Sequence, residues 1–321
     1  MKNFALIGTS GYIAPRHLRA IKENGCNLLS SFDISDSAGV IDSFFPNSAF
    51  FTEFERFDRH IEMLKQEKDI KIDFLSVCSP NYLHDAHIRA GLRWGSHVIC
   101  EKPLVLTTRN IELLSKLESQ FDKKIYNILQ LRHHPAIKKL KHHIDTSKEN
   151  KIYDVDLTYI TSRGNWYYAS WKGDDSKSGG IATNIGIHFF DMLGWIFGDL
   201  VSNTVHLREH DRASGYIEFK KARVRWFLSI NNKTLPENAK LKTFRSISVD
   251  NEILEFSDGF TDLHNESYYE ILNGNGFGLN EARRCIELAQ LIRYSEISSL
   301  KNEYHPFAKL PLEKHPFLVN V

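Results

Sequence analysis

Two segments of this chain carry side chains suited to moving a proton. One is CEKPL, residues 100–104, in which Lys102 follows the short apolar run HVIC. The other is TNIGIHFFDML, residues 183–193, a mostly apolar segment that carries Asn184, His188 and Asp191 at spacings of four and three. On a helix these spacings place the three polar side chains on one stripe.

Oxidation of an alcohol needs a hydride acceptor on one side of the carbon and a base within hydrogen-bond reach of the hydroxyl. His188 can take the proton near neutral pH, because an imidazole titrates at about 6.5. Lys102 can stabilise the alkoxide as an ammonium, or be the base itself if burial deprotonates it, and both assignments stay open. The alternative for His188 is a buried structural histidine. A metal site is not expected, because no cysteine or second histidine shares its stripe.

A glycine-rich turn near the N-terminus predicts a dinucleotide site. The apolar run NFALIG leads into GTSGYIA and then a helix, so backbone N–H groups can approach a pyrophosphate at the positive end of that helix. The next run, LLSSFD, ends in a carboxylate that can accept both ribose hydroxyls and repel a 2′-phosphate, which favours NAD over NADP. The alternative role of this aspartate is to cap a turn. The predicted cofactor contacts here are Gly8, Ser10, Gly11, Tyr12, Ile13 and Asp33.

Two later turns add polar groups at the same edge of the predicted sheet. SPNYLH follows the apolar run IDFLSVC, and EKP follows HVIC. A doubly wound sheet binds its ligands at the carboxyl ends of its strands, where these turns lie. The predicted cofactor contacts here are Ser79, Pro80, Asn81, His84, Glu101 and Lys102.

The order of apolar runs and helical segments predicts two domains. Over residues 1–130, strand-like runs alternate with amphipathic helices, which predicts an α/β fold with a doubly wound parallel sheet. From residue 131 onward the strands show period-two alternation, and residues 215–230 and 244–259 each read as a hairpin. We therefore expect a Rossmann domain over 1–130 and, over 131–321, an α+β domain with a large, mainly antiparallel sheet.

The bulk composition excludes several classes of function. The chain has 321 residues, 42% hydrophobic and 25% charged, which is usual for a globular protein of about two domains. Its formal net charge is +1, so we expect neither nucleic acid nor an anionic membrane as a partner. The four cysteines form no CxxC pair, which argues against a zinc ribbon or a thioredoxin-like site. We see no signal peptide and no apolar run of about 20 residues, so we expect a cytoplasmic protein.

The motifs together resemble those of the Gfo/Idh/MocA oxidoreductases. The resemblance covers nearly the whole chain and is carried by GTSGYIA, Asp33, SPNYLH, EKP and NIGIHFFD. It implies an NAD-dependent oxidoreductase, with Lys102 and His188 at the positions of the family's catalytic lysine and histidine. The family often has an aspartate four residues before that histidine, where this chain has Asn184.

Three further segments are similar to the UDP-N-acetyl-2-amino-2-deoxyglucuronate dehydrogenases of that family. They are YNILQLRHHPAI, YITSRGNWYYASWKGD and KSGGIATNIGIHFFDML. The resemblance implies oxidation by NAD of the C3 hydroxyl of UDP-N-acetylglucosaminuronic acid to the 3-keto sugar. That reaction serves bacterial O-antigen, lipopolysaccharide and other surface-polysaccharide synthesis, through 2,3-diacetamido uronic acids. The resemblance also implies two features of relatives: 2-oxoglutarate as a second substrate that reoxidises bound NADH, and a homo-oligomer, either dimer or tetramer.

A substrate of this kind carries a carboxylate and a diphosphate, and the loop of residues 162–180 offers groups to bind them. Arg163 can grip a carboxylate through two parallel hydrogen bonds, and Lys177 can contact a phosphate. The alternative interpretation is a solvated surface loop. The predicted substrate contacts are Lys102, Arg163, Tyr167, Lys172, Lys177, Asn184 and His188.

Two other functions are compatible with these residues. One is another NAD-dependent sugar or inositol dehydrogenase of the same family, which a substrate range without a UDP requirement would favour. The other is a non-catalytic NAD-binding regulator on the same fold, which would bind NAD and turn over no nucleotide sugar. Such a regulator has no need for Lys102 and His188 together, and the chain has both.

Overall fold

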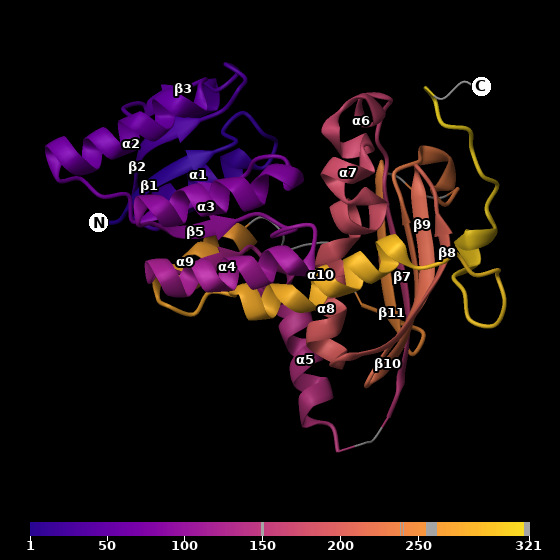
Figure 1. The fold of residues 1–321 in the computed structure, drawn as a ribbon. Helices are drawn as coiled ribbons and strands as arrows, with labels where there is room; N and C mark the ends of the chain where they lie inside the picture. Colours follow the sequence, from indigo (N-terminus) through magenta and orange to yellow (C-terminus); the bar gives the residue numbers. More distant parts are fainter. Residues whose placement is uncertain (149–150, 238, 240, 255–261, 318–321) are drawn as a thin grey trace. The chain divides into compact units, whose positions relative to one another are not determined.

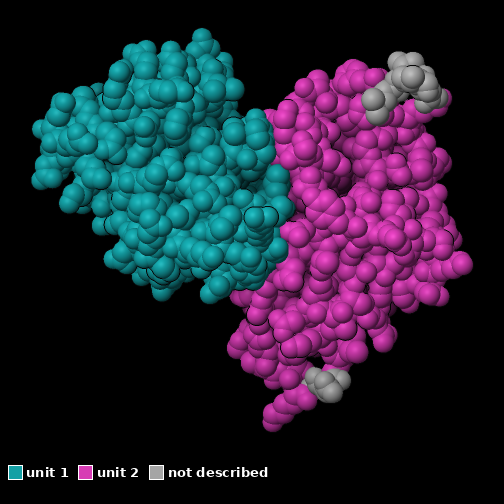
Figure 2. Space-filling model, viewed as in Figure 1, with its two compact units in different colours: residues 1–133, 261–283 teal, residues 134–260, 284–321 magenta. Residues whose placement is uncertain are grey.

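The chain forms two compact units, shown in different colours in Figure 2. The computed structural model describes the whole chain except residues 149–150, 238, 240, 255–261 and 318–321. The first unit holds Met1–His133 and Thr261–Arg283, and the second holds His134–Phe260 and Arg284–Val321. The sequence predicted one boundary, after residue 130. The chain instead returns to the first unit for a segment that sequence analysis assigned to the second domain.

The first unit is built on a six-stranded parallel sheet in the order β3-β2-β1-β4-β5-β6 (Figure 1). Its strands are β1 (Asn3–Ile7), β2 (Asn27–Phe32), β3 (Ala49–Phe51), β4 (Phe74–Val77), β5 (His97–Cys100) and β6 (Ile125–Asn127). The predicted doubly wound α/β fold is confirmed. The strand order reverses between β1 and β4, and sheets of this kind bind ligands beyond the carboxyl ends of the strands at that point.

Helices join these strands and cover the sheet. They are α1 (Ala14–Glu23), α2 (Phe54–Lys68), α3 (His84–Trp94), α4 (Thr108–Phe121) and α9 (Leu263–Leu272), with short 3-10 turns at Gly39–Ser43, Asn81–Leu83 and Gln130–His133. In α1 the apolar residues recur at helical spacing, so Ala14, Leu18 and Ile21 are all fully buried. Gly25, just past the end of α1, has a φ of +66° that suits a helix terminus.

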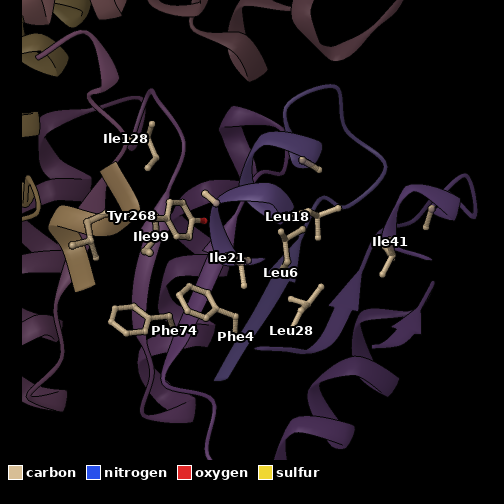
Figure 3. Packing of buried hydrophobic residues seen from close by; sticks show 14 residues of the cluster. Phe4, Leu6, Leu18, Ile21, Leu28, Ile41, Phe74, Ile99, Ile128 and Tyr268 are labelled. Carbon is tan, nitrogen blue, oxygen red and sulfur yellow. The ribbon is translucent and has the colours of Figure 1, made fainter. Parts of the chain in front are cut away.

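One hydrophobic core of the first unit depends on the segment that returns late in the chain. Phe4 of β1 stacks on Phe74 of β4 with ring centroids 5.1 Å apart, and Tyr268 of α9 stacks on Phe4 at 5.9 Å (Figure 3). Ile271 of α9 belongs to the same cluster. Each such side chain contributes about 1.5–3 kcal/mol on full burial, so α9 supplies a substantial part of this core.

The second unit contains a six-stranded mixed sheet in the order β12-β11-β7-β10-β9-β8. Its strands are β7 (Tyr153–Thr161), β8 (Leu200–Arg208), β9 (Arg212–Phe219), β10 (Ala222–Ser229), β11 (Thr243–Val249) and β12 (Glu252–Ile253). Only the central pair β7–β10 is parallel among the described strand pairs, so the predicted mainly antiparallel sheet is confirmed. Both predicted hairpins are present as β9–β10 and β11–β12, although residues 255–259 of the second lie outside the described residues.

Helix α8 (Ile187–Phe197) covers one face of this sheet. A Cβ on Gly186, just before α8, would lie 2.4 Å from Leu228 Cδ1, and the ring of Phe190 meets Trp226 edge-on at 5.3 Å. The opposite face carries Phe227, which stacks on His305 at 5.7 Å. Adjacent residues of β10 therefore serve opposite faces, as a strand requires.

The remaining helices of the described chain comprise three longer ones, α5, α8 and α10, and several short helices and turns. They are α5 (Pro135–Thr146), α6 (Trp166–Ala169), α7 (Asp175–Ser178), α8 (Ile187–Phe197), α10 (Leu279–Tyr294), the turns Trp171–Gly173, Asn232–Thr234 and Pro306–Lys309, and a wide π-type turn at Ala182–Gly186. Among the described residues, no helix is long and apolar enough to cross a membrane.

Candidate active site

The glycine turn after β1 brings the ends of two central strands into contact. Gly8 has a φ of +90°, and a Cβ at this position would lie 2.5 Å from the carbonyl carbon of Cys78 and 2.6 Å from the nitrogen of Ser79. The N–H of Gly11 donates to the carbonyl oxygen of Gly8 at 3.1 Å, which closes the turn. Glycine at this position is therefore required by the close approach of the chain after β4, and the predicted contact of the turn with a pyrophosphate stays a prediction.

The turn delivers the chain to the start of α1 in a form that suits an anion. No side chain among the described residues caps the N-terminus of α1 at Ile13. The N–H groups of Ala14 and Arg16 donate to the carbonyl oxygens of Gly11 and Ile13, at 3.1 and 3.0 Å, and Pro15 has no N–H. Tyr12, between the turn and the helix, is 91% exposed. The start of α1 suits a pyrophosphate because the helix dipole is positive at this end.

Asp33 connects the glycine turn to the end of β2. Its Oδ2 accepts the N–H of Ser10 at 2.9 Å, and its Oδ1 accepts the N–H of Ser35 at 2.9 Å. The turn-capping role and the predicted ribose role are compatible, because each half-buried carboxylate oxygen keeps a second lone pair. With the cradle at Gly8 and the start of α1, this carboxylate makes the first unit fit NAD.

The turns after β4 and β5 are tied together by His84. Its Nε2 lies 2.8 Å from the carbonyl oxygen of Ser79, and its Nδ1 lies 2.7 Å from that of Pro103. Asn81 is buried beside it, and Pro80 is half-buried. The predicted contacts on these two turns thus form one connected edge of the sheet.

The backbone around Lys102 is held by hydrogen bonds from the side chain of Asn127 and to the side chain of Glu101. Asn127 Nδ2 donates to the carbonyl oxygens of Cys100 at 2.9 Å and of Glu101 at 3.2 Å. The N–H of Lys102 donates to Oε2 of Glu101 at 3.1 Å, and the Lys102–Pro103 peptide bond is cis. The Glu101 side chain is buried inside the first unit, whereas the sequence predicted it as a cofactor contact.

In the second unit, Asn184 and His188 flank the junction between the wide turn and α8. Asn184 Nδ2 donates to the hydroxyl of Tyr167 at 2.8 Å. Burial raises the pKa of Tyr167 to about 12, so its phenol stays protonated. His188 is half-buried and meets the ring of Tyr159 edge-on at 5.8 Å. Asp191, predicted on the same stripe, is buried within α8.

The other predicted substrate contacts lie on the loop between β7 and α8. The Arg163 side chain is exposed, and the backbone N–H of this residue donates to the carbonyl oxygen of Ile230 at 2.8 Å. Lys172 lies over the ring of Trp171, 4.2 Å from its centroid. Lys177 is also exposed. Within the second unit, the structure joins Tyr167 and Asn184 directly and leaves two cations of this loop at the surface.

Sequence analysis missed the buried partners of Glu101. They are His17 on α1 and His264 on α9. His17 in turn contacts the hydroxyl of Tyr268 on α9, which contacts Ser76 on β4. One local signal exists: His17 falls on the buried face of α1 with Leu18 and Ile21, where a polar residue needs a partner. No local pattern identifies that partner.

Comparison with known proteins assigns the chain to a family. Residues 2–128 match a model described as an oxidoreductase family with an NAD-binding Rossmann fold, and residues 143–242 match the model of its C-terminal alpha/beta domain. The WlbA (WbpB) dehydrogenase of Thermus thermophilus is 49% identical, with 96% of this chain and 100% of that chain covered and a TM-score of 0.92. The chain belongs to the Gfo/Idh/MocA oxidoreductase family.

This membership, predicted from the motifs, makes the protein an NAD-dependent oxidoreductase whose first unit is the NAD-binding domain. This structure of the Thermus thermophilus protein contains NAD and alpha-ketoglutarate. A second structure of that protein contains NAD and UDP-GlcNAcA; it is 48% identical, with a TM-score of 0.91 and with 96% of this chain and 100% of that chain covered. Among curated proteins, the glucose-6-phosphate 3-dehydrogenase of Bacillus subtilis is 23% identical over 65% of this chain and 57% of its own length. The D-glucoside 3-dehydrogenase of Escherichia coli is 26% identical over 40% of this chain and 37% of its own length. The chain thus spans 37% to 57% of these curated relatives.

Proposed function

We propose that this protein oxidises the C3 hydroxyl of UDP-N-acetylglucosaminuronic acid to the 3-keto sugar, with NAD as the oxidant. The observation that carries the proposal is the 48% identity, over the full length of that chain, to a dehydrogenase solved with NAD and UDP-GlcNAcA. The fit of Gly8, Asp33 and the start of α1 to a dinucleotide supports the cofactor half of the reaction.

The proposed reaction divides the work between two side chains. When bound, NAD accepts the hydride from C3 of the sugar. His188 takes the proton of the C3 hydroxyl, and Lys102, as an ammonium, stabilises the oxygen while its negative charge develops. Asn184 orients the sugar, and its hydrogen bond to the Tyr167 hydroxyl fixes the direction of its amide.

The charged groups of the loop are proposed to recognise the acidic ends of the substrate. Arg163 binds the uronate carboxylate through its planar guanidinium, because paired N–H groups match a carboxylate. Lys177 binds a phosphate of the UDP group, and Lys172, which lies against Trp171, adds positive charge beside it. The exposure of Arg163 and Lys177 supports this role, since both side chains are accessible to a ligand.

The wider setting of the enzyme follows the family resemblance. In the proposal 2-oxoglutarate is a second substrate, and its reduction to 2-hydroxyglutarate returns the cofactor to its oxidised form. The protein works in the cytoplasm as a homo-oligomer, either dimer or tetramer, in the synthesis of O-antigen or another surface polysaccharide. The complex of the Thermus thermophilus dehydrogenase with alpha-ketoglutarate supports the second substrate.

The test is turnover of UDP-N-acetylglucosaminuronic acid by the purified protein, with and without 2-oxoglutarate, followed by mass spectrometry of the 3-keto product. Lys102→Met and His188→Asn are each expected to lower kcat by about 100-fold or more, which is the usual loss on removing a positioned acid or base. The matched controls are Lys116→Met and His142→Asn, which alter exposed side chains of the same types on α4 and α5.

Each outcome of this test has a definite meaning. Product from the wild type, with losses confined to the two site variants, supports the substrate and both residues. Product that accumulates beyond one equivalent of enzyme only with 2-oxoglutarate supports recycling of the cofactor in place. Absence of product with NAD bound refutes the proposed substrate, and free sugars and inositols are tested next. NAD binding without turnover of any of them would favour the regulator.

A further inference from the structure

A buried network of hydrogen bonds surrounds Glu101 in the first unit and has no part in the roles above. The Nε2 atoms of His17 and His264 lie 2.9 and 2.8 Å from the same carboxylate oxygen, Oε1. The N–H of Lys102 donates to the other oxygen, Oε2, at 3.1 Å. Glu101, His17 and His264 are 6%, 0% and 2% exposed, so bulk water cannot replace these donors.

One assignment of protons satisfies this network. A carboxylate only accepts hydrogen bonds, so His17 and His264 both carry a proton on Nε2. The Nδ1 of His17 then accepts from the Tyr268 hydroxyl at 2.7 Å, and the Ser76 hydroxyl donates to that of Tyr268 at 2.7 Å. Burial alone would raise the pKa of Glu101, but the hydrogen bonds from the two histidines outweigh it and hold that pKa well below its usual range. The carboxylate is therefore ionised at neutral pH.

An alternative interpretation of this cluster is a metal site, since two histidines and a glutamate converge there. A metal would use the Nε2 lone pairs of His17 and His264 and would move the proton of His264 to its Nδ1. That Nδ1 is buried and has no acceptor among the described residues. A ligating histidine normally donates its second N–H to an acceptor, so the hydrogen-bonded carboxylate is the better account.

The network connects three segments of the first unit. His17 lies on α1, which follows the glycine turn, and His264 lies on α9. Glu101 directly precedes Lys102 and binds its N–H. Because the carboxylate is fixed by two buried donors, the backbone of Lys102 is fixed with it.

We propose that Glu101 is a positioning residue: held by His17 and His264, its carboxylate keeps Lys102 in the geometry that the oxidation requires. The inference rests on the proposed function, because Glu101 acts through the role of Lys102 there. A displacement of about 1 Å can cost about 100-fold in rate, so Glu101→Gln is expected to lower kcat by roughly 10- to 100-fold. The KM for NAD is expected to stay unchanged, because the glycine turn and Asp33 are intact.

The first test is a double-mutant cycle between Glu101→Gln and Lys102→Met, read as kcat on the UDP sugar. In the Lys102→Met background, Glu101→Gln is expected to change kcat by less than about two-fold, because no lysine remains to be positioned. Ser96→Ala is the matched control, since it removes a buried hydrogen bond to the carbonyl oxygen of Ile72 elsewhere in the same unit. An equal loss of kcat from Glu101→Gln with and without Lys102 would overturn the proposal.

The second test needs no sugar substrate. Acetic anhydride labels lysines of the purified protein, and mass spectrometry gives the labelling rate of half-buried Lys102 relative to exposed Lys116. In Glu101→Gln this ratio is expected to rise about three-fold, because local ordering around Lys102 is lost. Tyr268→Phe removes only the hydroxyl that donates to His17, and it should raise the ratio by less.

The two tests separate this inference from the proposed function. An unchanged labelling ratio in both variants, with native circular dichroism, would refute the positioning of Lys102 whatever the substrate is. A raised ratio in a protein whose wild type does not oxidise the UDP sugar would refute the proposed substrate and keep the positioning role. A raised ratio with a non-additive cycle supports both.

Discussion

Replacing Gly8 with alanine tests the geometry of the dinucleotide turn. A side chain in the left-handed region costs about 1–2 kcal/mol, and Gly8 has a φ of +90°. The added Cβ would also lie 2.5–2.6 Å from backbone atoms of Cys78 and Ser79, which cannot rotate away. Overpacking of this kind costs about 1–3 kcal/mol more, so Gly8→Ala is expected to lower the free energy of unfolding by about 2–5 kcal/mol.

A matched control separates the two contributions. Gly25 has a φ of +66°, and a Cβ there would meet nothing within 4 Å, so Gly25→Ala is expected to cost only the conformational part, about 1–2 kcal/mol. Urea titrations followed by circular dichroism give both values, and calorimetry gives the NAD affinity. Gly8→Ala should weaken NAD binding by about ten-fold or more, equivalent to about 1.4 kcal/mol, because relief of the clash moves the turn. Equal stability and equal NAD affinity in the two variants would refute the steric reasoning.

Three further outcomes are expected. Burial lowers the pKa of His305 from 6.5 to about 4, so the unfolded chain binds a proton before the folded chain does as the pH falls. At about 1.4 kcal/mol per pKa unit, the free energy of unfolding falls by about 3 kcal/mol between pH 6.5 and about 4. In His305→Asn, the free energy of unfolding from urea titrations should change less with pH over this range. Tyr167→Phe removes the hydroxyl that accepts from Asn184, worth about 1 kcal/mol, so the KM for the UDP sugar should rise about five-fold in steady-state assays while NAD affinity stays constant. Asp211→Ala leaves the buried guanidinium of Arg212 without its carboxylate, so the free energy of unfolding, measured by thermal unfolding, should fall by about 3–5 kcal/mol.

The local sequence pattern predicts most of the first unit, because each longer strand is an apolar run that stops at turn residues. β3 (Ala49–Phe51) is not among the predicted strands, since three half-buried residues are too few to show a period. The membership of residues 261–283 in the first unit also has no local signal. It depends on the packing of Tyr268 against Phe4, a contact between distant parts of the chain.

In the candidate site, too, the local sequence predicts some residues and not others. Gly8 and Asp33 could be predicted because their backbone positions, just after β1 and β2, require particular residue types. The partners of Glu101 could not, because His17 and His264 lie 84 and 163 positions away along the chain. The wide turn before α8 was also missed; it ends at Gly186, where a Cβ would lie 2.4 Å from Leu228 Cδ1, a contact between distant parts of the chain.

The return of α9 to the first unit has a consequence for synthesis of the protein. The ribosome must translate residues 134–260 before α9 emerges, which takes roughly 6–25 s at about 5–20 residues per second. During that interval the nascent N-terminal domain exposes the apolar surface around Phe4 that Tyr268 later covers, and Glu101 lacks one of its two histidine donors. The domain that binds the cofactor is thus the first to begin folding, yet it completes its core only after residues 134–260 of the second unit have been synthesised. A chaperone that shields exposed apolar surface would act on the nascent chain during this interval.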